Sequence, residues 1–171
     1  MTTEGVSIQI CSFNEIGNFA FSGIHVLVSA MKPEDPERRP DWIKPGNHLV
    51  LAFYDSEKII PGFACPTQDH IRRLLDFFDQ ARKRCPSGLK LLVHYHKGRI
   101  RSPALALSML CRLLRKGKEE AFACLLEIQP GAFSNQLLVD LSDQVLGLDG
   151  ALSGIVRDYQ DKAFRRIMDR D

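Results

Sequence analysis

The chain has 171 residues, 44% of them hydrophobic, and its 23 basic and 21 acidic residues leave a formal charge of +2. This length fits a single domain, residues 1–171, and so balanced a charge argues against a protein whose main task is to bind nucleic acid. Five cysteines without a C-x-x-C pair argue against a disulfide framework or a zinc site and favour a reducing cytoplasm.

Targeting signals are not apparent in the sequence. No apolar run approaches the roughly 18 residues that a membrane span needs. The first ten residues, MTTEGVSIQI, lack a basic segment followed by a long apolar one. We therefore expect a protein that is neither exported nor anchored in a membrane.

Three predicted strands occupy the first third of the chain. Residues 6–12 and 25–30 are short β-rich runs, and the polar segment between them can hold one or two helical turns. A charged, proline-rich loop at 31–47 leads to a third strand at 48–55, which places Asp55 at its carboxyl end.

The rest of the chain alternates between predicted helices and one more strand. Thr67 can cap a helix whose apolar positions recur at helical spacing and which should end near residues 85–88. A strand at 89–94, a loop at 95–101 and a helix opening at Ser102–Pro103 follow. The remaining residues predict helices at 118–128, 135–147 and 151–168.

This order of elements predicts an α/β fold, with a small, mostly parallel central sheet flanked by helices and a helical C-terminal half. Ligand sites in such folds lie beyond the carboxyl ends of the strands. Asp55 and the 95–101 loop both fall at that edge, so we expect them to lie near each other.

The 95–101 loop has the features of a phosphate-binding site. A loop that feeds a helix N-terminus directs unpaired N–H groups and positive partial charge toward one point. Gly98 permits a tight backbone path, and Arg101 can bind two phosphate oxygens at once. The predicted anion-binding residues are His96, Lys97, Gly98, Arg99, Ile100, Arg101 and Ser102.

The stretch HYHKGRIRS, residues 94–102, resembles the signature H-C-x-x-G-x-x-R-S/T of the Cys-dependent protein-tyrosine and dual-specificity phosphatases. Every fixed position matches except the nucleophile, where Tyr95 stands. A likeness to small bacterial tyrosine-phosphatase-like proteins continues through residues 127–150. The resemblance implies a tyrosine-phosphatase-like fold and places Asp55 at the position of the general acid. It also makes His94 a structural, hydrogen-bonding residue.

Tyr95 cannot replace the thiolate of that family, because a phenol has a pKa near 10 and is a weaker, longer nucleophile. An inward ring would fill the place of the phosphate, whereas an outward ring would leave an anion cradle without a nucleophile. Asp55 is then expected to hold its loop by hydrogen bonds. Ser102 is expected to cap the following helix.

Three functional hypotheses follow. The leading one is a pseudophosphatase that keeps its phosphate-binding loop and binds a phosphate- or sulfate-like anion, including one carried by a phosphorylated or acidic protein partner. The second is an atypical phosphatase that uses water activated by His96 or Asp55. The third is an interaction scaffold with an occluded site.

Two other sites are weaker hypotheses. His94 and His96 lie two residues apart at a strand end, but no acidic or cysteine ligand lies near them in the sequence. Cys65 follows Asp55 and could replace the missing nucleophile, although nothing places it at an anion site. We therefore expect no metal and no cofactor, and the sequence does not predict an oligomeric state.

Overall fold

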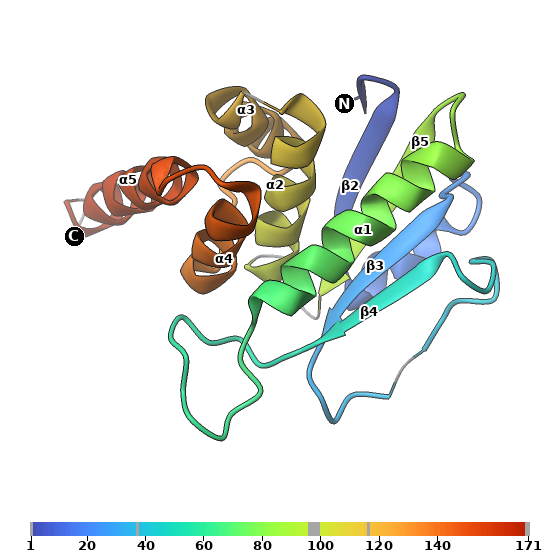
Figure 1. Cartoon of the computed structure of the whole chain (residues 1–171), viewed down its shortest axis with the longest axis horizontal. Helices are drawn as coiled ribbons and strands as arrows, with labels where there is room; N and C mark the ends of the chain where they lie inside the picture. The colour runs from blue at the N-terminus through green and yellow to red at the C-terminus, as the bar shows by residue number, and fades with distance from the viewer. Residues whose placement is uncertain (1, 37, 96–99, 116, 170–171) are drawn as a thin grey trace.

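The computed structural model describes residues 2–36, 38–95, 100–115 and 117–169. Its sheet has the strand order β1-β2-β5-β3-β4, in which β1 pairs antiparallel with β2 and all other neighbours are parallel. The strands are β1 (Thr2–Thr3), β2 (Val6–Ser12), β3 (Val26–Met31), β4 (His48–Ala52) and β5 (Leu89–Tyr95). The predicted mostly parallel sheet is thereby confirmed (Figure 1).

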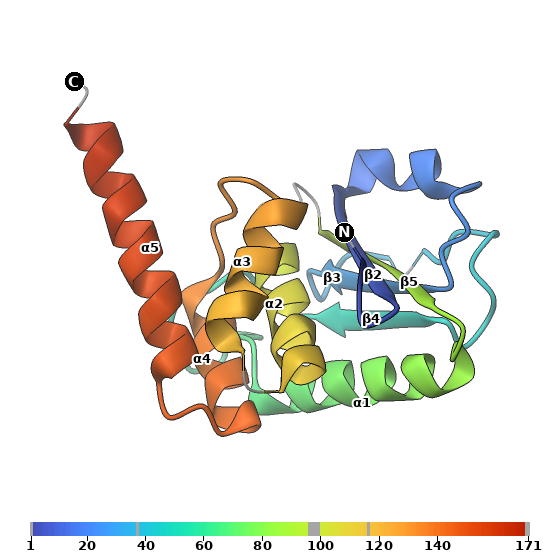
Figure 2. The ribbon, with the colours of Figure 1, turned by 90° about the horizontal axis from the view of Figure 1, so that it is seen from above.

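Helices cover this sheet, and the chain after β5 is mainly helical. They are the 3-10 helix η1 (Phe13–Phe19), α1 (Gln68–Arg84), α2 (Arg101–Leu114), α3 (Lys118–Ile128), α4 (Gln136–Leu146) and α5 (Ala151–Met168). Figure 2 shows α1 on one face of the sheet and η1 on the other, with α5 projecting from the body toward the C-terminus. This arrangement confirms the predicted helical C-terminal half.

The central strand β5 is apolar on both faces, as a strand covered from both sides must be. Leu91 and Val93 contribute to the larger core, which the sheet shares with α1 to α5. Leu92 points into a smaller cluster with Leu27 and Ile16 of η1. The two cores hold β5 rigidly, so the residues at its carboxyl end start from a fixed position.

The strand predicted over 48–55 is shorter than expected, because β4 ends at Ala52. Phe53 still donates its N–H to the Met31 carbonyl at 2.9 Å, but Tyr54 donates to the Ala64 carbonyl at 2.8 Å. The chain therefore leaves the sheet at Tyr54 and enters a loop that folds on itself. Asp55 lies in this loop and not in the strand.

The helix that follows this loop begins as predicted, with Thr67 in extended conformation as its N-cap. The Thr67 N–H donates to His70 Nδ1 at 3.1 Å, so His70 takes the place of an acidic residue in the capping box. None of the helices formed by the described residues is long and apolar enough to cross a membrane.

Candidate functional site

The candidate site lies at the carboxyl edge of the sheet, where β5 ends at Tyr95 and α2 begins at Arg101. Four of the predicted anion-binding residues, His96, Lys97, Gly98 and Arg99, lie outside the described residues. Ile100 is the N-cap of α2, and its carbonyl accepts the N–H of Asn135 at 3.1 Å. The site can therefore be built from Tyr95, Ile100 and Arg101 and from the loop after β4.

Ser102 is not the helix cap that the sequence predicts. Helix α2 begins at Arg101, so its N-cap is Ile100, two residues before Ser102, and Ile100 makes no side-chain capping bond. Ser102 lies inside the first turn of α2 and is completely buried. Among the described residues, Ser102 Oγ has no hydrogen-bond partner.

Arg101 is a buried cation held by backbone carbonyls. Its side chain is only 1% exposed. Nη1 donates to the Phe53 carbonyl at 2.7 Å and lies 3.5 Å from the Met31 carbonyl, so the guanidinium joins the ends of β3 and β4. Burial lowers the pKa of Arg101 to about 10, opposed by the charges of Asp55 and Asp35. The guanidinium stays charged at neutral pH.

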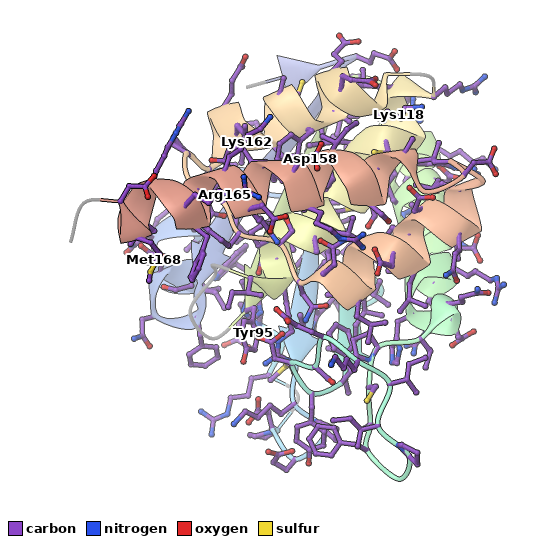
Figure 3. All side chains as sticks on the ribbon, turned by 90° about the vertical axis from the view of Figure 1, so that its left-hand side faces the viewer. Tyr95, Lys118, Asp158, Lys162, Arg165 and Met168 are labelled. Carbon is purple, nitrogen blue, oxygen red and sulfur yellow. The ribbon has the colours of Figure 1, made fainter. Side chains whose placement is uncertain are left out.

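Tyr95 stacks on this cation. The centroid of its ring lies 3.3 Å from Arg101 Cζ, and the ring of Phe53 lies 5.7 Å from the same atom. Two aromatic rings around a desolvated guanidinium are a favourable cation–π arrangement. Figure 3 shows Tyr95 between the C-terminal helices and the loops that follow β3 and β4. The phenol thus covers one face of the arginine that the sequence assigns to anion binding.

Asp55 occupies the edge of Arg101 that the ring leaves open. Its Oδ2 lies 3.8 Å from Arg101 Nε, and its Oδ1 accepts a hydrogen bond from Asn135 Nδ2 at 2.8 Å. At 3.8 Å the Nε contact is an ion pair and not a hydrogen bond. Sequence reasoning expected Asp55 and the loop to lie together, and the structure brings Asp55 and Arg101 together at this edge.

Asn135 is a site residue that sequence reasoning missed. Its Oδ1 caps α4 by accepting the Leu138 N–H at 2.9 Å, while Nδ2 donates to Asp55 and to the Ser56 carbonyl. The backbone N–H of Asn135 also donates to the Ile100 carbonyl. Asn135 therefore joins three segments: the start of α2, the loop after β4 and α4. An asparagine before an apolar helical pattern is a capping signal, but nothing in the sequence reveals the contact with Asp55.

His94 is buried and takes part in a hydrogen-bond chain that joins β5, β3 and β4. Its Nε2 lies 2.5 Å from Ser29 Oγ, which lies 2.6 Å from His48 Nε2. Ser29 and His94 are directly paired across β3 and β5, which explains their contact. Burial, with a smaller contribution from His48, lowers the pKa of His94 to about 4. The imidazole is therefore neutral at physiological pH.

The structure also shows the surroundings of the two weaker candidate sites, the histidine pair and Cys65. Among the described residues, no group of three His, Cys, Asp or Glu side chains could hold a metal ion, and His96 lies outside them. Cys65 is buried inside its own loop, where its sulfur accepts the Ile60 N–H at 3.3 Å. The Cys65 thiol thus helps to close that loop.

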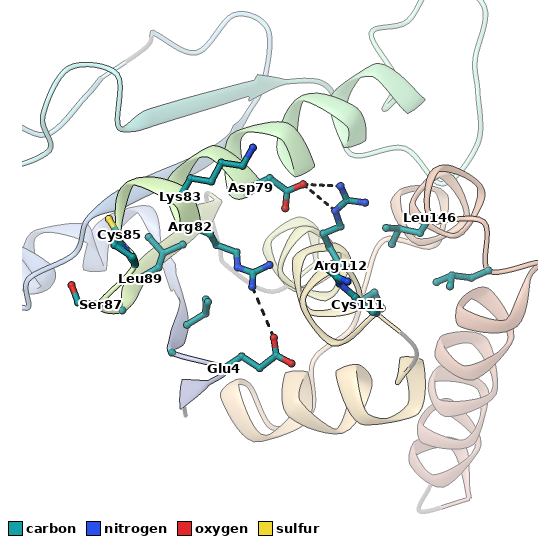
Figure 4. Close-up of a pocket in the computed structure, with 16 residues that line it drawn as sticks. Glu4, Asp79, Arg82, Lys83, Cys85, Ser87, Leu89, Cys111, Arg112 and Leu146 are labelled. Carbon is teal, nitrogen blue, oxygen red and sulfur yellow. Dashed lines mark hydrogen bonds and ion pairs between the residues drawn. The ribbon is translucent and has the colours of Figure 1, made fainter.

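A larger cavity of about 720 Å³ lies at the opposite, amino edge of the sheet. Figure 4 shows two pairs of charged residues in it, with Arg112 bonded to Asp79 and Arg82 facing Glu4. The carboxyl ends of α1 and α2 face this region, and their dipoles disfavour anions there. It does not coincide with any residue that the sequence assigns to a site.

Comparison with known proteins identifies the fold. The chain matches no family model and resembles no curated protein in sequence at a significant level. Solved structures do match: human DUSP28 (16% identity, TM-score 0.62, covering 86% of this chain and 96% of that one) and DUSP15 (16%, 0.64, 95% and 94%). A third is the human tyrosine phosphatase-like serine/threonine/tyrosine-interacting protein (18%, 0.58, 85% and 93%).

These structural neighbours are all phosphatases or phosphatase-like proteins. The chain has the fold of the tyrosine and dual-specificity phosphatases, as its signature-like stretch predicts. At identities below 20% this likeness establishes the fold alone.

Proposed function

We propose that this chain is a phosphatase-fold protein without phosphatase activity, a pseudophosphatase that acts by binding a partner. The observation that carries the proposal is the stack of Tyr95 on Arg101, with 3.3 Å between the ring centroid and Cζ. A phenol takes the position of the nucleophile, and its ring lies against the arginine that would hold the phosphoryl group. One of the structural neighbours is likewise described by its name as an interacting protein.

The chemistry supports the same conclusion. A covalent mechanism needs an activated nucleophile, and a phenol with a pKa near 10 is a poor one at neutral pH. Without a phosphoenzyme there is no leaving group for Asp55 to protonate. Its contacts with Asn135 and Arg101 instead give it a role in holding the loop after β4.

The test is hydrolysis of an aryl phosphate by the wild-type protein, Tyr95→Cys and the matched variant Tyr95→Ala. Both variants remove the ring, but only the first supplies a thiol, at the end of β5 beside the first residue of α2. The pKa of a thiol falls near a helix N-terminus and near an arginine. We expect turnover from Tyr95→Cys alone. Adding Asp55→Asn to Tyr95→Cys should lower that rate further, as loss of a positioned acid typically costs about 10²–10⁴-fold. Turnover by purified wild-type protein that Arg101→Ala abolishes would instead establish the atypical phosphatase.

A second candidate function is recognition of a phosphorylated or acidic partner by the loop before α2. The observation that favours it is that Arg101 Nε is buried without a hydrogen-bond acceptor among the described residues. An anion oxygen would satisfy this N–H and displace the Asp55 carboxylate, which lies too far away to do so.

Thermal unfolding with increasing inorganic phosphate tests this second function, since a ligand that binds only the folded state raises Tm. We expect phosphate to raise the Tm of the wild-type protein more than that of Arg101→Lys, whose ammonium lacks the planar donor geometry. Equal shifts for the two proteins would exclude Arg101 as the anion-binding residue.

A further inference from the structure

A second, smaller cavity of about 220 Å³ opens beside Tyr95. Its walls come from η1, the end of β3, the loop after β3 and the end of β5: Phe13, Ala30, Met31, Asp35, Pro36, Arg38, His94 and Tyr95. Pockets for whole drug-sized ligands have volumes of about 300–1,000 Å³. This cavity is therefore sized for one side chain of a partner and not for a cofactor.

One residue that lines the cavity, His94, has a buried polar atom without a partner among the described residues. His94 is 3% exposed, and its Nε2 is engaged by Ser29. Among the described residues, its other ring nitrogen, Nδ1, has no hydrogen-bond partner. Buried nitrogens of this kind are normally satisfied, so a ligand that reaches the cavity would find one strong polar contact there.

The hydrogen bonds of Ser29 determine which kind of ligand group can bond to His94 Nδ1. Ser29 Oγ has one proton and lies between Nε2 of His94 and Nε2 of His48, so His94 Nδ1 is a donor in one arrangement and an acceptor in the other. A hydroxyl group can serve in either role. A phosphate or carboxylate only accepts and an ammonium only donates, and the burial that keeps His94 neutral also disfavours a charged group.

The residues that line the cavity indicate which groups of a ligand would pack beside its hydroxyl. Phe13 and Tyr95 offer aromatic surfaces, and the Phe13 ring lies 6.1 Å from the His94 ring. Aromatic rings pack well against such walls and against the sulfur of Met31. Asp35 and Arg38 bring both signs of charge to the same cavity, which suits the N–H and C=O groups of a peptide backbone.

We propose that this cavity binds the unphosphorylated side chain of a tyrosine in a partner protein, with its ring between Phe13 and Tyr95 and its hydroxyl on His94 Nδ1. The neighbouring backbone of the partner contacts Asp35 and Arg38. This pocket is separate from the Nε edge of Arg101, so its failure would leave the proposed function standing.

The experiment is an NMR titration of the full chain, read at the His94 ring proton that disappears in His94→Gln. The probes are N-acetyl-tyrosinamide, p-cresol and toluene. We expect saturable shifts with the first two, with N-acetyl-tyrosinamide the tighter. Toluene should bind at least about tenfold more weakly, because it leaves Nδ1 unpaired. Equal binding of toluene and p-cresol, or no saturable shift at His94, would overturn the proposal.

A matched pair of phenylalanine variants locates the binding. Phe13 lines the cavity and is 42% exposed, whereas Phe21 is fully exposed and does not line it. We expect Phe13→Ala to weaken binding of N-acetyl-tyrosinamide at least about fivefold, a loss typical of an aromatic contact, and Phe21→Ala to leave it unchanged. Equal effects would place the binding elsewhere. Binding of p-cresol with exclusion of N-acetyl-tyrosinamide would overturn the assignment to a protein partner in favour of a free phenol.

Discussion

The two edges of the sheet each hold an arginine and an aspartate, but in opposite environments. At the amino edge, Arg112 lies 2.7 Å from Asp79 and its side chain is 48% exposed. At the carboxyl edge, Arg101 lies 3.8 Å from Asp55 and is almost completely buried. We expect the shorter ion pair to contribute less to the free energy of unfolding, because water screens exposed charges, whereas removing one partner of a buried cation is costly. Burial, and not distance, should therefore rank the effects of mutation.

Arg101→Ala should have the largest effect on stability. It leaves the Phe53 and Met31 carbonyls without their donor and opens a cavity between two aromatic rings. We predict a loss of about 3–5 kcal/mol in the free energy of unfolding, measured with urea. A loss below about 1 kcal/mol would mean that Arg101 behaves like the surface residue Arg112.

Acidification should produce the next largest effect, through His94. Its pKa is about 4 in the folded protein and near 6.5 when unfolded, so the unfolded state binds the proton first as the pH falls. Stability present above pH 6.5 is therefore lost progressively down to about pH 4, by about 3 kcal/mol for this one group. Urea unfolding at pH 7 and pH 4.5 should show a smaller loss for His94→Gln than for the wild type. An equal loss in both proteins would assign the effect to other groups.

Asn135→Ala should cost about 2 kcal/mol, because it removes the cap of α4 and the hydrogen bonds to the loop after β4. Asn135→Ser is the matched control, since a serine can still cap a helix but is too short to reach Asp55. We expect the serine variant to recover about half of the loss in urea unfolding. Full recovery would show that the contact with Asp55 contributes nothing.

Arg112→Ala should have the smallest effect, under about 1 kcal/mol, and salt should reduce it further. Urea unfolding of the wild type and variant in low and high NaCl gives the measurement. If this substitution proved as damaging as Arg101→Ala, the ranking by burial would be wrong.

The sequence predicts the fold well because its signals are local. Alternation and apolar runs mark the strands, and the spacing of Ile71, Leu74, Leu75, Phe78 and Ala81, all buried in the structure, marks α1. The strand predicted over 48–55 was too long, since its last residues bond within their own loop. The pairing of Thr2–Thr3 with β2 went unpredicted, because a strand so short leaves no pattern.

The site is less accessible to sequence reasoning, because its contacts join residues far apart in the chain. Arg101 is identified by its position in the motif, but the motif says nothing of the Phe53 and Met31 carbonyls that hold it. Ser29 and His48 meet His94 only through the sheet register. The motif also does not reveal which way the ring of Tyr95 points, although that direction decides what the loop can bind.

The most direct measurement is therefore the affinity for inorganic phosphate of the wild-type protein and of Tyr95→Ala, compared by calorimetry. The ring covers one face of the Arg101 guanidinium, and removing it opens that face without adding a nucleophile. We predict that Tyr95→Ala binds phosphate at least about tenfold more tightly, corresponding to about 1.4 kcal/mol. Equal affinity in the two folded proteins, or no binding by either, would contradict the claim that Tyr95 covers an anion-binding arginine.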